Sequence, residues 1–228
     1  MEIDMIVLAV DSAENVAAAA ITEDERLIGE YVLNCKNTHS ETLLPMVESL
    51  MKSARIKPDD IDLFACSAGP GSFTGVRIGV SLIKGLAFGR GKPCMGVSSL
   101  EALAYNFRGL DGIVCPVLDA RRGQLYNALF RIADGKVQRL KPDRVILADE
   151  LADELREISL PVSFCGSGAA IAAAACPDVA IQYDSAALKL QRGYSVALCA
   201  YRRYFEFPEE VLTDTQLSPT YLRSGSPS

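Results

Sequence analysis

The segment Gly69–Gly75 is the stretch whose residue types and spacing come closest to ligand-binding chemistry. It follows an apolar run and precedes a long helical pattern, so free N–H groups at the start of that helix could hold an anion. The Lys-Ser or Lys-Thr ending of a P-loop is absent, and the glycine spacing is not the dinucleotide fingerprint. Arg77 would meet an anion there, although its charge opposes the helix dipole. We therefore interpret the glycines as a tight turn that lets the helix pack closely.

The composition limits the partners of the chain. Its 228 residues carry a formal net charge of -6, which opposes direct nucleic-acid binding because phosphate contacts need clustered Lys and Arg. No apolar run is long enough for a membrane span, and the N-terminus is acidic where a signal peptide is basic. We expect a cytoplasmic protein without membrane contact. The seven scattered cysteines favour buried apolar roles over zinc sites or disulfides.

The first half must place these residues on alternating strands and helices. Thr38–Arg55 has helical spacing, with Pro45 inside it and a capping box predicted from Thr38 and Glu41. The predicted strands are Ile6–Asp11, Val16–Ile21, Arg26–Leu33, Ile61–Ala68 and Pro93–Val97, and the further helices are Val76–Phe88 and Ser98–Asn106. The order is βββαβαβα.

The second half begins the same order again. Val114–Asp119 repeats the strand followed by Asp of Val7–Asp11, and Ser163–Gly168 echoes Phe64–Gly69. Asp134-Gly135 marks the turn of a hairpin between Gln124–Ile132 and Lys136–Leu140, and Leu188–Phe205 is predicted to be one closing helix. We predict two lobes, residues 1–108 and 109–228, with the final helix and tail packing back on the first.

Several motifs together resemble one known family. They are Val10-Asp11-Ser12, His39–Pro45, Gly69–Gly79, Val97–Leu100, Asp119–Tyr126 and Pro219–Arg223. With two lobes that each open on a strand ending in Asp, the chain resembles the actin, Hsp70 and sugar-kinase (ASKHA) superfamily, and within it the TsaB (YeaZ) branch. The resemblance implies an α/β fold of two RNase H-like lobes, each with a mixed sheet of βββαβα order.

The resemblance also implies a function. Family members support the N6-threonylcarbamoyladenosine modification at position 37 of tRNA, as non-catalytic partners of the paralogue TsaD together with the ATPase TsaE. We expect a homodimer when the chain is alone, indirect contact with tRNA, and no cofactor of its own, with ATP or ADP and Mg²⁺ at the partner interface. The alternatives are a small ASKHA-type ATPase or phosphotransferase, and a glycoprotease-type metallopeptidase.

The metallopeptidase alternative is disfavoured by His39. The catalytic paralogue holds its metal between two histidines four residues apart, whereas Leu43 stands four residues after His39, the one histidine of this chain. We therefore predict no metal site and no catalytic residue.

The resemblance places two groups of candidate residues. Family members pair through helices that match Thr38–Arg55 and Val76–Phe88, so we predict a partner interface on the apolar stripes of these helices. Glu at Leu43 or Val80 should disrupt it. Core burial is nevertheless the usual role of an apolar helix stripe. The residues of the predicted interface are His39, Leu43, Val47, Leu50, Val76, Val80 and Ile83. Active superfamily members bind nucleotide at residues that match Asp11, Ser12, Asp119, Arg121, Gly166 and Gly168, which as turn and cap formers would have structural roles instead.

Overall fold

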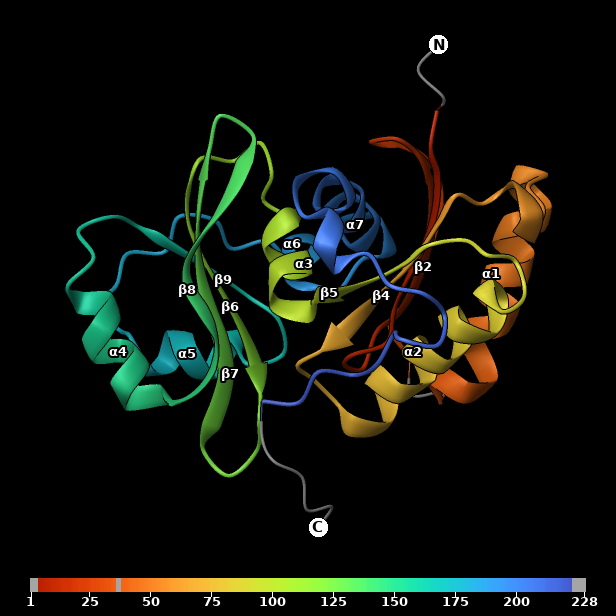
Figure 1. Ribbon diagram of the computed structural model, residues 1–228. Coiled ribbons are helices and arrows are strands. Elements are labelled where there is room, and N and C mark those ends of the chain that lie inside the picture. Colours follow the sequence, from red (N-terminus) through yellow and green to blue (C-terminus); the bar gives the residue numbers. More distant parts are fainter. Residues whose placement is uncertain (1–3, 36–37, 223–228) are drawn as a thin grey trace. The chain divides into compact units, whose positions relative to one another are not determined.

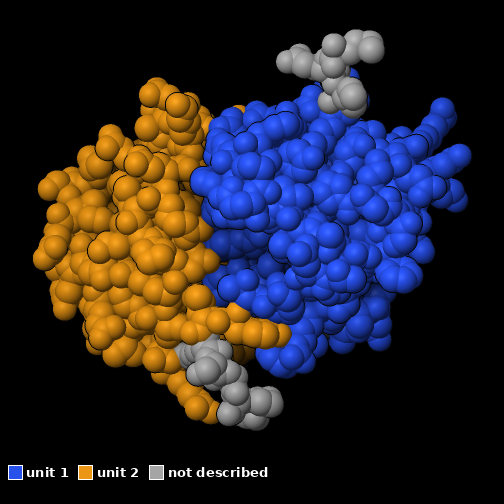
Figure 2. Space-filling view, viewed as in Figure 1, with its two compact units in different colours: residues 1–102, 191–220 blue, residues 103–190, 221–228 orange. Residues whose placement is uncertain are grey.

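The computed structural model describes residues 4–35 and 38–222, so Arg223 of the last family motif lies outside the described residues. The chain divides into two compact units (Figure 2). Unit 1 comprises residues 1–102 and 191–220, and unit 2 comprises residues 103–190 and 221–228. The sequence-based boundary lay between residues 108 and 109, with the final helix returning to the first lobe. Helix α7 (Gly193–Glu206) belongs to unit 1.

Unit 1 is built on a five-stranded mixed sheet in the order β3-β2-β1-β4-β5. The pairs β1–β2 and β2–β3 are antiparallel, whereas β1–β4 and β4–β5 are parallel. The strands are β1 (Ile6–Asp11), β2 (Ala17–Glu23), β3 (Arg26–Leu33), β4 (Leu63–Gly69) and β5 (Cys94–Ser98). Because two of its pairs are parallel, the carboxyl ends of β1, β4 and β5 meet at one edge of the sheet.

Helices cover both faces of this sheet (Figure 1). Helices α1 (His39–Ala54) and α2 (Phe73–Ala87) pack on one face, and α7 packs on the other against β1 and β2. Unit 1 also contains two short 3₁₀ turns, η1 (Pro58–Asp60) and η2 (Pro208–Glu210). Helix α3 (Ser99–Tyr105) begins at the end of its first segment. Burial on both faces explains why the central strands are apolar throughout.

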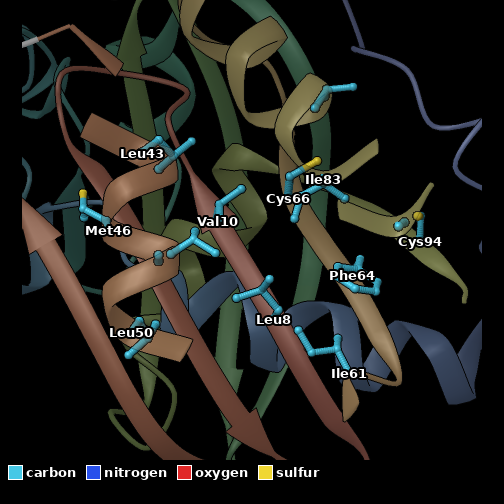
Figure 3. Close-up of a cluster of buried hydrophobic side chains, with 14 of the residues drawn as sticks. Leu8, Val10, Leu43, Met46, Leu50, Ile61, Phe64, Cys66, Ile83 and Cys94 are labelled. Atoms are coloured by element: carbon cyan, nitrogen blue, oxygen red, sulfur yellow. The ribbon is translucent and has the colours of Figure 1, made fainter. Parts of the chain in front are cut away.

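The core of unit 1 lies between the sheet and α1 and α2 (Figure 3). Leu8 of β1 and Phe64 of β4 share this cluster with Leu43 of α1 and Ile83 of α2, and each of these four side chains is 0% exposed. Full burial of one such side chain contributes roughly 1.5–3 kcal/mol. This cluster therefore fixes which face of each helix is turned inward.

Unit 2 repeats the first four strands of unit 1. Its sheet has the order β8-β7-β6-β9, with β6–β7 and β7–β8 antiparallel and β6–β9 parallel, as β3-β2-β1-β4 in unit 1. The elements are β6 (Gly112–Asp119), β7 (Gln124–Ala133), β8 (Lys136–Leu147), α4 (Ala148–Arg156), β9 (Val162–Cys165), α5 (Ala169–Ala175) and α6 (Ala186–Lys189). The predicted α/β class with two βββαβα units is confirmed.

Two local predictions at helix ends are wrong. The predicted helix Leu188–Phe205 is interrupted between α6 and α7, because Glu30 of β3 accepts the Tyr194 N–H at 3.0 Å and pairs with Arg192, which starts α7 at Gly193. Thr38 is the N-cap residue of α1 but its side chain makes no capping bond, so the capping box is not formed. Within the described residues, no helix combines the length and apolarity needed to cross a membrane.

The segment after η2 also belongs to unit 1 and covers an edge of its sheet. Leu212 exchanges two backbone hydrogen bonds with Cys94 of β5, at 2.8 and 2.9 Å. The Lys84 ammonium of α2 donates to the carbonyls of Thr215 and Leu217, at 3.1 and 2.9 Å. Leu217 is 1% exposed and belongs to the core cluster. The segment is therefore part of the fold.

We expect Leu217→Ala to lower the free energy of unfolding by about 2–4 kcal/mol, because truncation leaves a cavity beside β5. Urea denaturation of the whole chain measures this. The control is Leu160→Ala, whose leucine is 51% exposed and whose loss should cost less than about 0.5 kcal/mol. Equal losses in the two variants would contradict the assignment of Leu217 to the core.

Candidate functional site

A groove of about 450 Å³ runs between α1 and α2. Leu44 and Phe73 border it and are 43% and 44% exposed. The Arg77 guanidinium lies 3.8 Å from the centre of the Phe73 ring, a cation–π geometry that holds both side chains at the rim. The remaining lining residues are His39, Ser40, Leu43, Thr74, Ile78, Ser81 and Leu82. The groove thus offers apolar surface bordered by one cation and several hydroxyl groups.

A more polar pocket of about 650 Å³ adjoins this groove and shares His39, Ser40, Thr74 and Ile78 with it. Its other lining residues are Asn15, Asn34, Cys35, Thr38, Ser72 and Gly75. The first residues of both α1 and α2 line it. One continuous depression therefore follows the two helices, apolar along their length and polar at their beginnings.

His39 has a structural contact at this polar end. Its Nε2–H donates to the Glu14 carbonyl at 2.5 Å, and its Nδ1 is buried without a hydrogen-bond partner in the described part of the chain. Leu43, one turn later, is 0% exposed. Within residues 4–35 and 38–222, no group of three or more His, Cys, Asp and Glu side chains is placed to hold a metal ion. His39 therefore ties the β1–β2 loop to α1.

The predicted interface stripe faces inward, and this part of the prediction is wrong. Leu43, Val47, Leu50, Val76, Val80 and Ile83 are all between 0% and 3% exposed. They pack on the sheet, so Glu at Leu43 or Val80 would disrupt the fold of unit 1 before it reported on any dimer. Of the predicted interface residues, His39 and Leu43 alone line the groove, and Leu43 does so from its buried floor.

The exposed and half-buried residues of the groove form a second face of α2 that sequence reasoning missed. On α2, Phe73, Arg77 and Ser81 follow one another at four-residue spacing, and so do Thr74, Ile78 and Leu82. Four-residue spacing places side chains on the same face of a helix. Phe73 and Ile78 are apolar but lie outside the Val76–Val80–Ile83 stripe. This is the signal in the sequence that could have revealed the groove residues of α2.

The Gly69–Gly75 turn is filled by the chain itself. The Ser72 N–H donates to the Ala13 carbonyl at 2.6 Å, and the Ser12 hydroxyl donates to the Gly75 carbonyl at 2.9 Å. A Cβ atom on Gly75 would lie 2.1 Å from the Ser12 carbonyl oxygen. The structure therefore supports close packing as the role of these glycines.

Asp11 is closed off from solvent in this arrangement. It is 1% exposed, its Oδ1 accepts the Ala13 N–H at 2.9 Å, and its Oδ2 has no hydrogen-bond partner among the described residues. Burial raises the pKa of Asp11 to about 6, against smaller lowering effects of Ala13 and Ser67. Ser12 is also 1% exposed. These two residues therefore do not fit a nucleotide, which needs accessible ligands.

The other predicted nucleotide residues lie together in unit 2, at the carboxyl ends of β6 and β9. Asp119 Oδ1 accepts the Arg121 N–H at 2.8 Å, and the Asp119 N–H donates to the Ser167 hydroxyl at 3.1 Å. Gly166 has a φ of +89°, and the Gly168 N–H donates to the Val117 carbonyl at 2.9 Å. These bonds are those of turn formers. Nucleotide binding at this group stays a prediction.

Comparisons with known proteins agree with this architecture. A family model described as TsaD, tRNA N6-adenosine threonylcarbamoyltransferase, matches residues 27–206. The tRNA threonylcarbamoyladenosine biosynthesis protein TsaB of Bacillus subtilis is 38% identical over 162 residues, 71% of this chain and 71% of that protein. TsaB of Escherichia coli is 32% identical over 152 residues, 66% of this chain and 65% of that protein.

Solved structures show the same fold. YeaZ from Pseudomonas aeruginosa superposes with a TM-score of 0.82 at 24% identity, covering 96% of this chain and 100% of that one. Component A of the (R)-2-hydroxyglutaryl-CoA dehydratase of Acidaminococcus fermentans reaches a TM-score of 0.52 at 10% identity, covering 87% and 98% of the two chains.

The two βββαβα units define an α/β protein of the ASKHA class. In this chain, the space between the β1–β2 loop and the Gly69–Gly75 turn is filled by the protein's own backbone. Within that class, the chain belongs to the TsaB (YeaZ) family, as the sequence motifs indicated.

A pair of glycine substitutions on α2 tests the packing at the turn. We expect Gly75→Ala to lower the free energy of unfolding by roughly 1–3 kcal/mol, because the new Cβ would overlap the Ser12 carbonyl oxygen. Gly85→Ala lies on the same helix with nothing within 4 Å of its Cβ, so it should raise stability by about 0.5–1 kcal/mol. Chemical denaturation measures both, and a neutral or stabilising Gly75→Ala would refute the close approach.

Proposed function

We propose that this chain is a non-catalytic partner subunit in the biosynthesis of N6-threonylcarbamoyladenosine at position 37 of tRNA. The names of its TsaB relatives support the pathway, and the match to the TsaD family model supports a paralogous partner. The net charge of -6 supports a division of labour in which the partner holds the tRNA.

The groove between α1 and α2 is the observation that carries the proposal. It presents Leu44 and Phe73, both more than two-fifths exposed, over a floor that continues into the core. A partner helix can bury such side chains in the depression between two helices, and aromatic and Arg residues at the centre of an interface contribute most to binding. The occupant in this proposal is a helix of TsaD.

The same groove serves a second copy of the chain when TsaD is absent, so that the homodimer and the TsaD complex exclude each other. TsaE joins the TsaD complex, and ATP or ADP with Mg²⁺ is bound at the partner interface. Binding of this subunit stabilises the active conformation of TsaD, which is a population shift and needs no catalytic group here.

Two features favour this role over the enzymatic alternatives. The buried carboxyl of Asp11 opposes a small ATPase or phosphotransferase, since that reaction needs a carboxylate that reaches the nucleotide. Leu43 occupies the place of the second histidine of a metallopeptidase.

Charge substitutions at the rim test the groove. We expect Leu44→Glu and Phe73→Glu to weaken binding to TsaD at least tenfold, because a buried unpaired carboxylate is costly. Isothermal titration gives the affinities, and circular dichroism checks folding. Phe88→Glu is the matched control, since Phe88 is 73% exposed beyond the end of α2 and does not line the groove. Wild-type affinity in both rim variants would place the interface elsewhere.

Reconstitution tests the subunit role. With TsaD, TsaE, ATP, threonylcarbamoyl-adenylate and tRNA, modification should depend on this chain, and the rim variants should lose it in parallel with binding. Modification of tRNA by this chain with threonylcarbamoyl-adenylate alone would overturn the non-catalytic assignment.

A further inference from the structure

Asp11 is a buried carboxyl group, and among the described residues no cation acts on it. The groups that act on it are the Ala13 N–H and the Ser67 hydroxyl, and the buried Cys66 thiol of β4 is electrostatically coupled to it. The elements packed against β1 are β2, β4, α2 and α7, and in the described part of the chain none of them brings a charged side chain that acts on this carboxyl. Ionisation of Asp11 at this position would leave a negative charge with neither water nor a counter-ion.

The carboxyl group also holds a connection between two segments. Its Oδ1 fixes the Ala13 N–H, and the Ala13 carbonyl in turn accepts the Ser72 N–H at the start of α2. The Ser12 hydroxyl adds a bond to the Gly75 carbonyl. Since Ser72, Thr74 and Gly75 line the polar pocket, the state of this connection sets the shape of the polar end of the groove.

We propose that Asp11 is a proton-controlled latch, which in its neutral form holds the β1–β2 loop (residues 12–16) closed against the start of α2 and on ionisation favours an open state that admits water. The latch is a property of the free chain, and only its effect on TsaD binding rests on the proposed function.

The direction of the pH dependence follows from the two states. The pKa of Asp11 is about 6 when the loop is closed and 3.8 when the carboxyl is exposed. The free energy that favours closure is therefore fully present below pH 3.8, the pKa of the exposed carboxyl. It decreases as the pH rises from there through about 6. Between pH 5 and pH 8, the population of the open state should increase about tenfold.

Asp119 supplies a matched control. Its Oδ1 accepts the N–H two residues later, at 2.8 Å, as that of Asp11 does at 2.9 Å. Asp119 is only half-buried at the end of the equivalent strand of unit 2. The two aspartates therefore share their local bond and differ in burial, so that Asp11→Asn and Asp119→Asn separate the two effects.

Hydrogen exchange of the chain alone, corrected for the intrinsic pH dependence of exchange, tests the latch in wild type and both variants. In wild type and Asp119→Asn, protection of residues 12–16 and 72–76 should fall about tenfold from pH 5 to pH 8. In Asp11→Asn it should be independent of pH, because Asn keeps the Oδ1 acceptor and cannot ionise.

The proposal is overturned if wild-type protection does not change with pH, or if Asp11→Asn retains the wild-type change. Carbon-13 NMR of the side-chain carboxyl in the wild-type chain gives a second readout that does not depend on a variant folding. A titration midpoint near 6 supports the latch, and one near 4 overturns it. Neither measurement involves TsaD, so a failed binding experiment leaves this result unaffected.

Discussion

The close approach between the β1–β2 loop and the start of α2 is the contact on which the rest of unit 1 depends. Cβ atoms on Gly71 and Gly75 would lie 2.3 and 2.1 Å from the carbonyl oxygens of Ala13 and Ser12, so glycine is required at both places. This approach seats α2 on the sheet, and α2 together with α1 then forms the groove. It also covers Asp11, which makes the groove and the buried carboxyl two consequences of one backbone contact.

Local patterns predicted the elements well where the signal is itself local. The strand Arg26–Leu33 was predicted with the bounds that the structure gives, and the Asp134-Gly135 turn has both residues at positive φ. The start of α7 could not be predicted, because it depends on Glu30, 164 positions before Tyr194 in the chain. Helix boundaries set by such a distant acceptor carry no signature in the neighbouring residues.

The sequence placed the candidate interface on α1 and α2, but the apolar residues it named lie on the buried face of these helices. Two apolar stripes lie side by side on α2, one through Val76 and Val80 and one through Ile78 and Leu82. Helical spacing identifies both stripes and does not decide which of them meets the sheet. The decision is made by packing against Leu8 and Phe64, which belong to strands distant in sequence.

The sequence also does not decide the electrostatic difference between Asp11 and Asp119. Both follow an apolar strand and both accept the N–H two residues later, so the sequence describes them as equivalent. What separates them is desolvation, since the pKa of Asp11 is raised by burial beneath the loop contact. A carboxyl group that has lost water and gained no cation is unsuited to hold a ligand and well suited to respond to protons. The close approach of the β1–β2 loop to α2 thus makes Asp11 part of the framework behind the groove.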